Sequence, residues 1–231
     1  MTAPDRNIPI PPIAPPESAS LEAVRGAFSD SPEWIFAQHW RPTPEAEFQP
    51  ASLKAGWCPA YLHFLASFSD HDIVVLENHS SRSRLAVCDV FQVFLGRPEA
   101  DEYFEIHVTP NNRNQILGWT AGRFSAFVDG ATSLDDILVD CGHPPVSDTW
   151  VEEENSRWTA YLRIPVKMAD PAKKHFTPET VLTGTFCRYD VSPGSPAPVL
   201  SSTSAFPEKP KFHDNRHWHR LCLEPGGNDR G

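Results

Sequence analysis

Proline is the residue that most restricts how this chain can fold. The sequence has 24 prolines among 231 residues, and they are spread along its whole length. Proline has no backbone N–H and a fixed φ, so it interrupts helices and is kept out of central strands. We therefore expect few long helices, and we expect the prolines to lie in turns and at sheet edges.

Between the prolines, short apolar runs alternate with polar or small residues, which is the pattern of β-strands. About nine such runs occur at roughly 8–12-residue spacing, which is typical of a sandwich or barrel. The clearest pair, residues 89–96 and 102–109, flanks the turn sequence GRPEAD and predicts a hairpin. The other expected strands lie within residues 60–68, 72–77, 115–122, 123–130, 149–166, 181–192 and 219–224. We predict an all-β fold, an antiparallel β-sandwich of jelly-roll type.

Three segments do not fit the strand pattern. Residues 1–20 are rich in proline and predict an extended N-terminal arm, and residues 20–28 predict a short helix. Residues 167–179 are polar and predict a loop with one helical turn. We expect three parts: the arm and helix at 1–30, a single sandwich domain at 31–225 and a flexible tail at 226–231.

The hairpin strands predict two faces of different character, because alternate residues of a strand point to opposite sides of a sheet. One face is apolar and consists of Phe91, Val93, Leu95, Phe104, Ile106 and Val108. The other face is mixed and consists of Val90, Gln92, Phe94, Tyr103, Glu105 and His107. A mixed face can hold a polar ligand or can be ordinary solvated sheet.

The chain is acidic, with 30 Asp and Glu residues against 20 Lys and Arg residues and a formal net charge of −10. That charge repels a phosphate backbone, and no basic cluster offsets it, so we do not expect nucleic acid as a partner. No apolar run reaches the roughly 18 residues of a membrane span. The N-terminal residues lack a secretory signal. We expect a cytoplasmic protein, or an extracellular or periplasmic one if a leader has been removed.

Few patterns in the sequence carry catalytic or metal chemistry. The five cysteines form no CxxC pair, and their odd number favours reduced thiols. His213, His217 and His219 have the spacing H-x3-H-x-H, which predicts either a metal site or a loop that leads into a strand. GxSxG, SxxK and glycine-rich phosphate loops do not occur, so the sequence predicts no enzyme.

Five segments, in this order along the chain, resemble the motifs of family 9 carbohydrate-binding modules and their DOMON-like relatives. They are YLHFLASFSD, DVFQVFLGRPEADEYFEIHVTPNN, RWTAYLRIPV, LTGTFCRYD and KFHDNRHWHRLCLE, within residues 57–224. The resemblance implies a DOMON-like β-sandwich that binds a saccharide or a similar polyhydroxylated molecule without catalysis. It also implies that FHDNRHWHRL is the family's closing segment, with His213 in a loop, Trp218 buried and no metal triad.

The resemblance further implies which residues bind the ligand. Family members clamp a sugar ring between two aromatic side chains, and the corresponding positions here are Ala86 and Phe212. Gln92 stands where the family has glutamate, and Arg188 matches a recurring arginine. Aromatic faces pack on sugar rings, and amide, carboxylate, imidazole and guanidinium groups bind hydroxyls. We predict Phe212 and Trp119 as stacking platforms, with hydrogen bonds from Gln92, Glu105, His107 and Arg188.

Other functions stay open at this point. A DOMON-type haem domain could use Met168 and His175 as axial ligands. A structural or interaction domain that has lost sugar binding fits the same fold, and a hydrolase would need a pair of carboxylates. Family members can carry structural calcium in a loop, and the candidate pairs here are Asp70 with Asp72 and Asp135 with Asp136. We expect no other cofactor, and the oligomeric state is left open.

Overall fold

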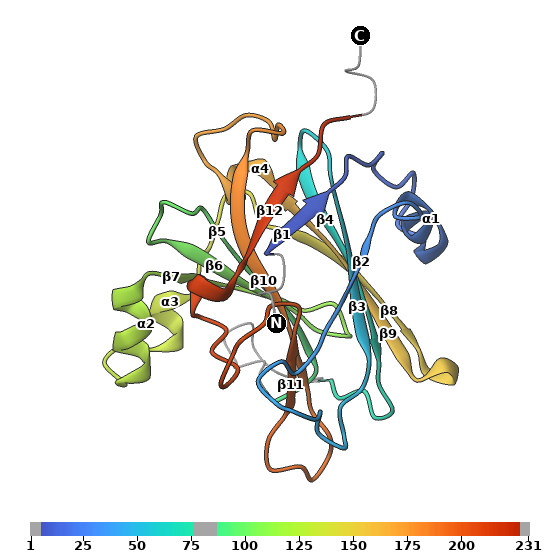
Figure 1. Ribbon diagram of the computed structural model, residues 1–231, viewed down its shortest axis with the longest axis vertical. Helices are drawn as coiled ribbons and strands as arrows, with labels where there is room; N and C mark the ends of the chain where they lie inside the picture. Colours follow the sequence, from blue (N-terminus) through green and yellow to red (C-terminus); the bar gives the residue numbers. More distant parts are fainter. Residues whose placement is uncertain (1–5, 76–86, 227–231) are drawn as a thin grey trace.

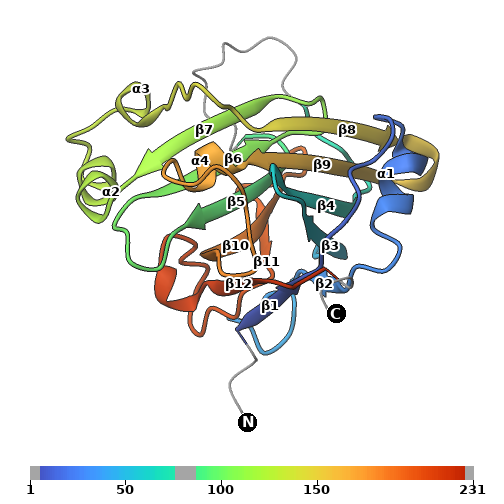
Figure 2. The same ribbon diagram turned by 90° about the horizontal axis from the view of Figure 1, so that it is seen from above.

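The computed structural model describes residues 6–75 and 87–226. Their main feature is a pair of β-sheets stacked face to face (Figures 1 and 2). In spatial order, the larger sheet contains β1 (Asn7–Ile10), β12 (His219–Leu223), β10 (Val181–Asp190), β5 (Val90–Gly96), β6 (Tyr103–Val108) and β7 (Asn114–Trp119), and β11 (Val199–Ser202) also pairs with β10. The smaller sheet contains β2 (Glu33–Ile35), β3 (Ala51–Trp57), β4 (Tyr61–Ser69), β9 (Arg157–Pro165) and β8 (Val146–Glu152). Every strand pairing in the described residues is antiparallel except that of β1 with β12, so the predicted sandwich is confirmed.

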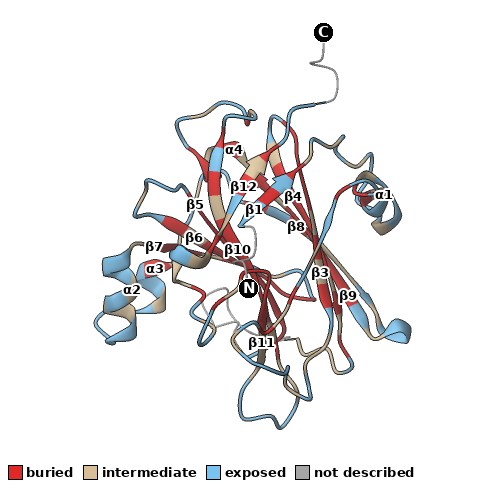
Figure 3. Cartoon of the chain, viewed as in Figure 1, coloured by how far each residue is buried: buried red, intermediate tan, exposed pale blue. Residues whose placement is uncertain are grey.

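The space between the sheets is filled by apolar side chains, many of them aromatic. The Phe68 ring of β4 lies 4.2 Å from Trp158 of β9 and 5.6 Å from Phe91 of β5, measured between centroids. Phe64 and Phe186 join the two sheets in the same way at 4.9 Å. Such ring pairs add about 0.5–1.5 kcal/mol beyond the burial of their area. The central strands of both sheets are accordingly buried (Figure 3).

The outer face of the seven-stranded sheet is covered as well. Residues 203–218, together with α2 (Ala121–Val128) and α3 (Leu134–Ile137), pack over it (Figure 1). As a result β5 is buried along its whole length, and the mixed face of the hairpin is not ordinary solvated sheet. The rings gathered there, which we call the outer aromatic cluster, are Phe94, Tyr103, Trp119, Phe206, Phe212 and Trp218.

The N-terminal segment forms part of the sheet, so a purely extended arm is not confirmed. β1 pairs in parallel with β12 at the edge of the sheet, and Ile8 and Ile10 are buried in the core. Pro9 is tolerated there because an edge strand does not need every N–H. Farther on, Ile13 N donates a hydrogen bond to Trp57 O of the smaller sheet.

The short helix expected at residues 20–28 is confirmed as α1 (Leu21–Ala27). Its first turn is capped by Ser20, whose side chain accepts a hydrogen bond from Ala23 N. Val24 of α1 packs in a cluster with Leu65 and Tyr161, so the helix covers part of the outer face of the five-stranded sheet (Figure 2). The polar loop after residue 166 begins with the expected helical turn, α4 (Val166–Ala169).

Residues 121–128 form α2 and not the strand that we predicted. Thr120 caps the helix by accepting a hydrogen bond from Arg123 N. Phe124 and Phe127 are three residues apart, which places both on one side of a helix, and both pack edge-on against Trp119. This cap and this packing outweigh the strand-like alternation of the sequence. No helix in the described part of the chain has the length and apolar character needed to cross a membrane.

The strand predicted at residues 72–77 is not formed in its described part. Residues 72–75 are irregular, while 76 and 77 lie outside the described residues. Val74 N donates to the Asp89 carboxylate, which takes the place of a strand partner. The sequence pattern also missed four strands, namely β1, β2, β3 and β11.

We expect Gly184→Ala to destabilise the protein by about 1–3 kcal/mol, the usual cost of overpacking. A Cβ at this position would lie 2.5 Å from the carbonyl oxygen of Phe94, which belongs to the backbone of the neighbouring strand and cannot move aside. Urea denaturation measures the loss. Gly142→Ala is the control, because nothing lies within 4 Å of the added Cβ. Equal stability of the two variants would contradict the packing described.

Candidate functional site

A cavity of about 210 Å³ opens on the outer face of the seven-stranded sheet. Strand register sets its polar floor, because Gln92 of β5 pairs with His107 of β6, and His107 pairs with Gln115 of β7. Glu105 precedes His107 by two residues and therefore points to the same face. The walls are formed by Trp119, Phe124, Phe127, Leu134, Tyr189 and His213.

Glu105 is the centre of a hydrogen-bond network on this floor. Trp119 Nε1 donates to Glu105 Oε2 at 2.8 Å. His107 Nε2 lies 2.6 Å from Glu105 Oε1, and since an ionised carboxylate only accepts, the imidazole donates. Gln92 Nε2 donates to the same oxygen at 3.3 Å. Each strand of the floor thus contributes a donor to one carboxylate.

The Glu105 carboxyl keeps its charge at neutral pH although it is buried. Burial raises its pKa, but His107, His213 and the Trp119 N–H outweigh burial, so the net pKa is below the ordinary value. Burial lowers the pKa of His213, and the charge of Glu105 opposes that shift. The Nε2 atom of His213 lies 3.7 Å from Glu105 Oε2. The floor therefore combines one negative charge with several N–H groups.

Two buried polar atoms of the floor have no hydrogen-bond partner among the described residues, namely Gln92 Oε1 and His107 Nδ1. The Gln92 amide is oriented by Glu105, which attracts its N–H group and leaves its oxygen free. His107 Nε2 donates to Glu105, so Nδ1 accepts when the imidazole is neutral and donates when it is charged. Buried polar atoms are normally paired. A hydroxyl group can donate to Gln92 Oε1 and can bond to His107 Nδ1 in either role.

The walls contribute flat apolar surface. Phe124 stacks on His213 at 4.0 Å with an interplanar angle of 21°, and Trp119 lies edge-on to Phe124 and Phe127 at 5.7 and 5.5 Å. The two phenylalanines were not predicted as wall residues because the sequence pattern of their segment indicated a strand. The signal was available: a threonine N-cap followed by two aromatic residues three positions apart is a helical pattern. Tyr189, another wall residue, was not predicted either.

Of the six residues predicted to bind a ligand, the structure brings Gln92, Glu105, His107 and Trp119 together at this cavity. Phe212 lies beside the cavity and does not line it. Its ring is buried in the outer aromatic cluster, 6.3 Å from Tyr189 and 6.4 Å from Phe94. It therefore supports the wall that Tyr189 forms.

Arg188 points to the other face of the same sheet. It pairs with Phe91 in the ladder between β10 and β5, and so shares the inward direction of that ring. Its guanidinium lies 3.1 Å from a carboxylate oxygen of Asp70 and of Asp190 and forms an ion pair with each. Its neighbours Cys187 and Tyr189 point outward. Arg188 therefore lies on the opposite face of the sheet from Gln92 and cannot contact a ligand that Gln92 binds.

The calcium ion that the resemblance allows remains a prediction. Of the two candidate aspartate pairs, one belongs to a larger group of carboxylates among the described residues. Asp70 and Asp72 join Asp190 in a group whose carboxylate oxygens lie within 4.8 Å of one another. Burial raises the pKa of Asp190 to about 6, although Arg188 opposes the shift. The other candidate pair has a local role, because Asp136 accepts hydrogen bonds from Ser133 and caps α3. Among the described residues it belongs to no such group.

The three C-terminal histidines take separate partners. His213 faces Glu105 in the cavity, His217 lies 3.8 Å from Asp214, and His219 bonds Thr203 Oγ1 at 3.2 Å. The described residues therefore contain no metal group made of these histidines. Met168 is packed in the core while His175 is exposed, so these two do not form a pair of haem ligands.

Comparison with solved structures shows what this fold is similar to. A provisionally named carbohydrate-binding protein from Bacteroides uniformis superposes with a TM-score of 0.73 at 13% identity, covering 94% of this chain and 99% of that one. A family 9 carbohydrate-binding module from Caldicellulosiruptor kristjanssonii in complex with cellotriose gives 0.60 at 12%, covering 97% of each chain. The same organism's family 9 module in complex with glucose gives 0.62 at 14%, covering 97% and 98%.

The TM-scores and coverage show a shared fold, and at 12–14% identity they show the fold alone. No protein-family model matches the sequence, and comparison with curated proteins gives no significant match.

We expect Arg188→Met to destabilise the protein by about 3–5 kcal/mol near neutral pH, because it leaves buried carboxylates without their partner. The cost should be smaller at pH 5 than at pH 8. The folded-state pKa of Asp190 is raised to about 6, so the folded protein takes up a proton there as the pH falls. Urea denaturation at both pH values tests this, with the exposed Arg220→Met as control. An equal cost at both pH values would contradict it.

Proposed function

We propose that the protein is a non-catalytic binding module for an uncharged saccharide or a similar polyol, held in the cavity on the outer face of the seven-stranded sheet. One observation carries the proposal. A single cavity combines aromatic surface with buried polar atoms, Gln92 Oε1 and His107 Nδ1, that the described protein atoms leave unbonded.

The chemistry of a sugar ring matches both parts of this cavity. The C–H groups of a pyranose form an apolar surface that can pack on the rings of Phe124, Trp119 or Tyr189. Its hydroxyl groups both donate and accept, so they can bond to Gln92 Oε1 and His107 Nδ1 beside the Glu105 carboxylate. Binding of a sugar by these contacts needs no metal and no cofactor.

The volume and charge of the cavity restrict the ligand further. About 210 Å³ is below the roughly 300–1,000 Å³ typical of drug-sized ligands. The cavity therefore suits one sugar ring, such as the end of a chain, better than a long internal segment. The charge of Glu105 disfavours anionic sugars. We expect a dissociation constant between millimolar and micromolar, or about 4–8 kcal/mol of binding free energy.

The same residues argue against hydrolysis at this cavity. Glycosidases of the usual kind use two carboxylates that flank the scissile bond. Glu105 is the only carboxylate among the described residues that line the cavity. Its pKa is lowered, so it is a poor general acid at neutral pH. The family 9 modules of similar fold, which are in complex with glucose and cellotriose, supply the first ligands to test.

Gln92→Leu should weaken binding of cellotriose or glucose at least tenfold in isothermal titration calorimetry, which corresponds to about 1.4 kcal/mol. The substitution keeps the side chain's bulk and removes the acceptor. Gln49→Leu makes the same chemical change near Arg188, away from the cavity, and should leave the affinity unchanged. If the wild-type protein binds no neutral saccharide, the proposed function is wrong. If Gln92→Leu binds as well as wild type, the site is wrong.

Glucuronate should bind at least tenfold more weakly than glucose, because its carboxylate would approach the charge of Glu105. Competition titrations at low and high salt measure the difference. Because buried charges are screened little, the preference should persist at high salt. Equal affinity for the two sugars would show that the ligand does not approach Glu105.

A further inference from the structure

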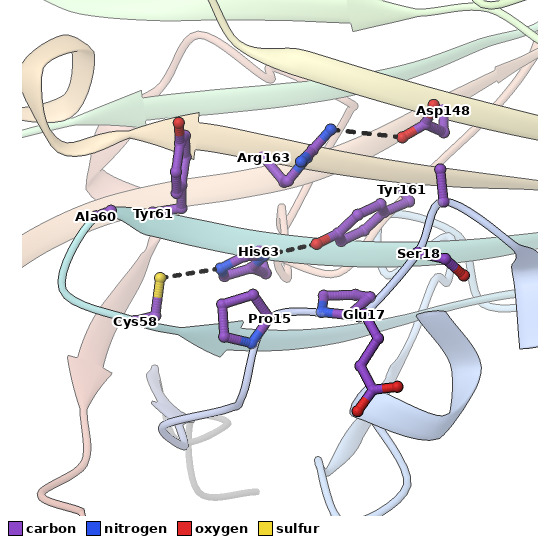
Figure 4. Close-up of a pocket in the computed structure, with 12 residues that line it drawn as sticks. Pro15, Glu17, Ser18, Cys58, Ala60, Tyr61, His63, Asp148, Tyr161 and Arg163 are labelled. Atoms are coloured by element: carbon purple, nitrogen blue, oxygen red, sulfur yellow. Dashed lines mark hydrogen bonds and ion pairs between the residues drawn. The ribbon is translucent and has the colours of Figure 1, made fainter. Parts of the chain in front are cut away.

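A second cavity lies on the outer face of the five-stranded sheet, and the saccharide proposal makes no use of it. It measures about 360 Å³ and lies between the sheet and the chain segment 15–19 that leads to α1. Cys58 comes from the turn between β3 and β4, His63 from β4, and Tyr161 and Arg163 from β9 (Figure 4). His63 and Arg163 are directly opposite each other in the ladder.

Three side chains form a chain of hydrogen bonds in this cavity. His63 Nε2 lies 3.3 Å from Cys58 Sγ, and His63 Nδ1 lies 2.8 Å from the Tyr161 hydroxyl (Figure 4). The imidazole and the Tyr161 ring are nearly parallel, with centroids 6.0 Å apart and an interplanar angle of 14°. His63 is 1% exposed, so the orientation of its imidazole is fixed by these contacts. This is the arrangement of a nucleophile, a base and a group that orients the base.

The two hydrogen bonds of the His63 ring leave it able to take the proton of the Cys58 thiol. Burial, and then the charge of Arg163, lower the pKa of His63 to about 4, so the ring is neutral at pH 7 and is a weaker base than an ordinary imidazole. A neutral imidazole has one N–H. When Nδ1 carries that proton and donates it to the Tyr161 oxygen, Nε2 is left to accept the proton of the Cys58 thiol.

We propose that Cys58 is a nucleophilic thiol site that reacts with small disulfides. The Cys58 proton moves to His63 Nε2 as Sγ forms a bond to one sulfur of the disulfide. The disulfide's own S–S bond breaks, and the departing thiolate takes the proton from the imidazole. The products are a mixed disulfide on Cys58 and one free small thiol.

Charge at the rim of the cavity restricts the disulfide. Arg163 is paired with Asp148 at 3.6 Å, which leaves the carboxylate of Glu17 as the unbalanced charge among the described lining residues. An uncharged or cationic disulfide therefore fits better than an anionic one. The aromatic side chains of Tyr61 and Tyr161 offer a flat surface to a ring-bearing probe.

The other cysteines provide internal comparisons. Cys88 and Cys187 are fully buried, and burial raises the pKa of both thiols. Burial also raises the pKa of Cys141. Cys222 is more exposed than Cys58, and its sulfur lies 3.8 Å from Asn7 Oδ1 and Arg220 O, which are not bases. Exposure alone thus predicts that Cys222 reacts first, whereas a base at the thiol predicts Cys58.

The test uses the wild-type chain and the uncharged probe 4,4′-dithiodipyridine at pH 7. Released thiopyridone gives the rate, and peptide mass mapping of the partly modified protein gives the site. We expect Cys58 to react at least tenfold faster than Cys222, and Cys58→Ser to lose the fast phase. Faster modification of Cys222 overturns the proposal, and this comparison needs no variant.

His63→Gln then tests the base. We expect its rate at Cys58 to fall at least tenfold, with Cys222 unchanged. A wild-type rate at Cys58 overturns the role of His63. The buried Cys88 and Cys187 report on folding in the same experiment, because labels on them reveal an unfolded variant. If His63→Gln is unfolded, the relative rates of Cys58 and Cys222 in the wild-type protein decide whether Cys58 is the reactive thiol.

Discussion

The seven-stranded sheet is covered on both faces, and most features of the molecule depend on that constraint. Its inner face packs against the five-stranded sheet, and its outer face lies beneath residues 203–218 and α2. Polar side chains on a covered face cannot rely on water, so they must pair with one another. Glu105 answers this by gathering N–H groups from Trp119, His107 and Gln92. The geometry that satisfies Glu105 also leaves two polar atoms of the cavity floor without a partner among the described residues.

The overall class of fold could be predicted because period-two alternation and turn residues are local signals. The hairpin of residues 89–109 and its two faces follow from the pattern, and the structure has them as predicted. The pairing of β1 was not predictable in this way, because its partner β12 is distant in sequence. The helix at residues 121–128 has a local signal in its N-cap and aromatic spacing, but its packing on His213 depends on a residue distant in sequence. Local propensity is a weak guide where tertiary packing decides.

The candidate site was predictable in part for the same reason. Gln92, Glu105 and His107 could be assigned to one face because they share a hairpin whose register is fixed. Arg188 belongs to a strand whose register against that hairpin the sequence does not reveal, and one residue of offset places it on the opposite face. Phe124 and Phe127 were missed because their segment was assigned the wrong periodicity.

The parallel pairing of β1 with β12 has a consequence for synthesis of the chain. Asn7 is aligned with Arg220 and Ile10 with Leu223, so nearly the first described residues are held by nearly the last. On a ribosome, β1 emerges long before its partner exists. Ile8 and Ile10 therefore stay exposed, or shielded by a chaperone, until β12 has been synthesised. Sheet closure is thus a late step, and a chain that stalls before β12 presents an open edge to its neighbours.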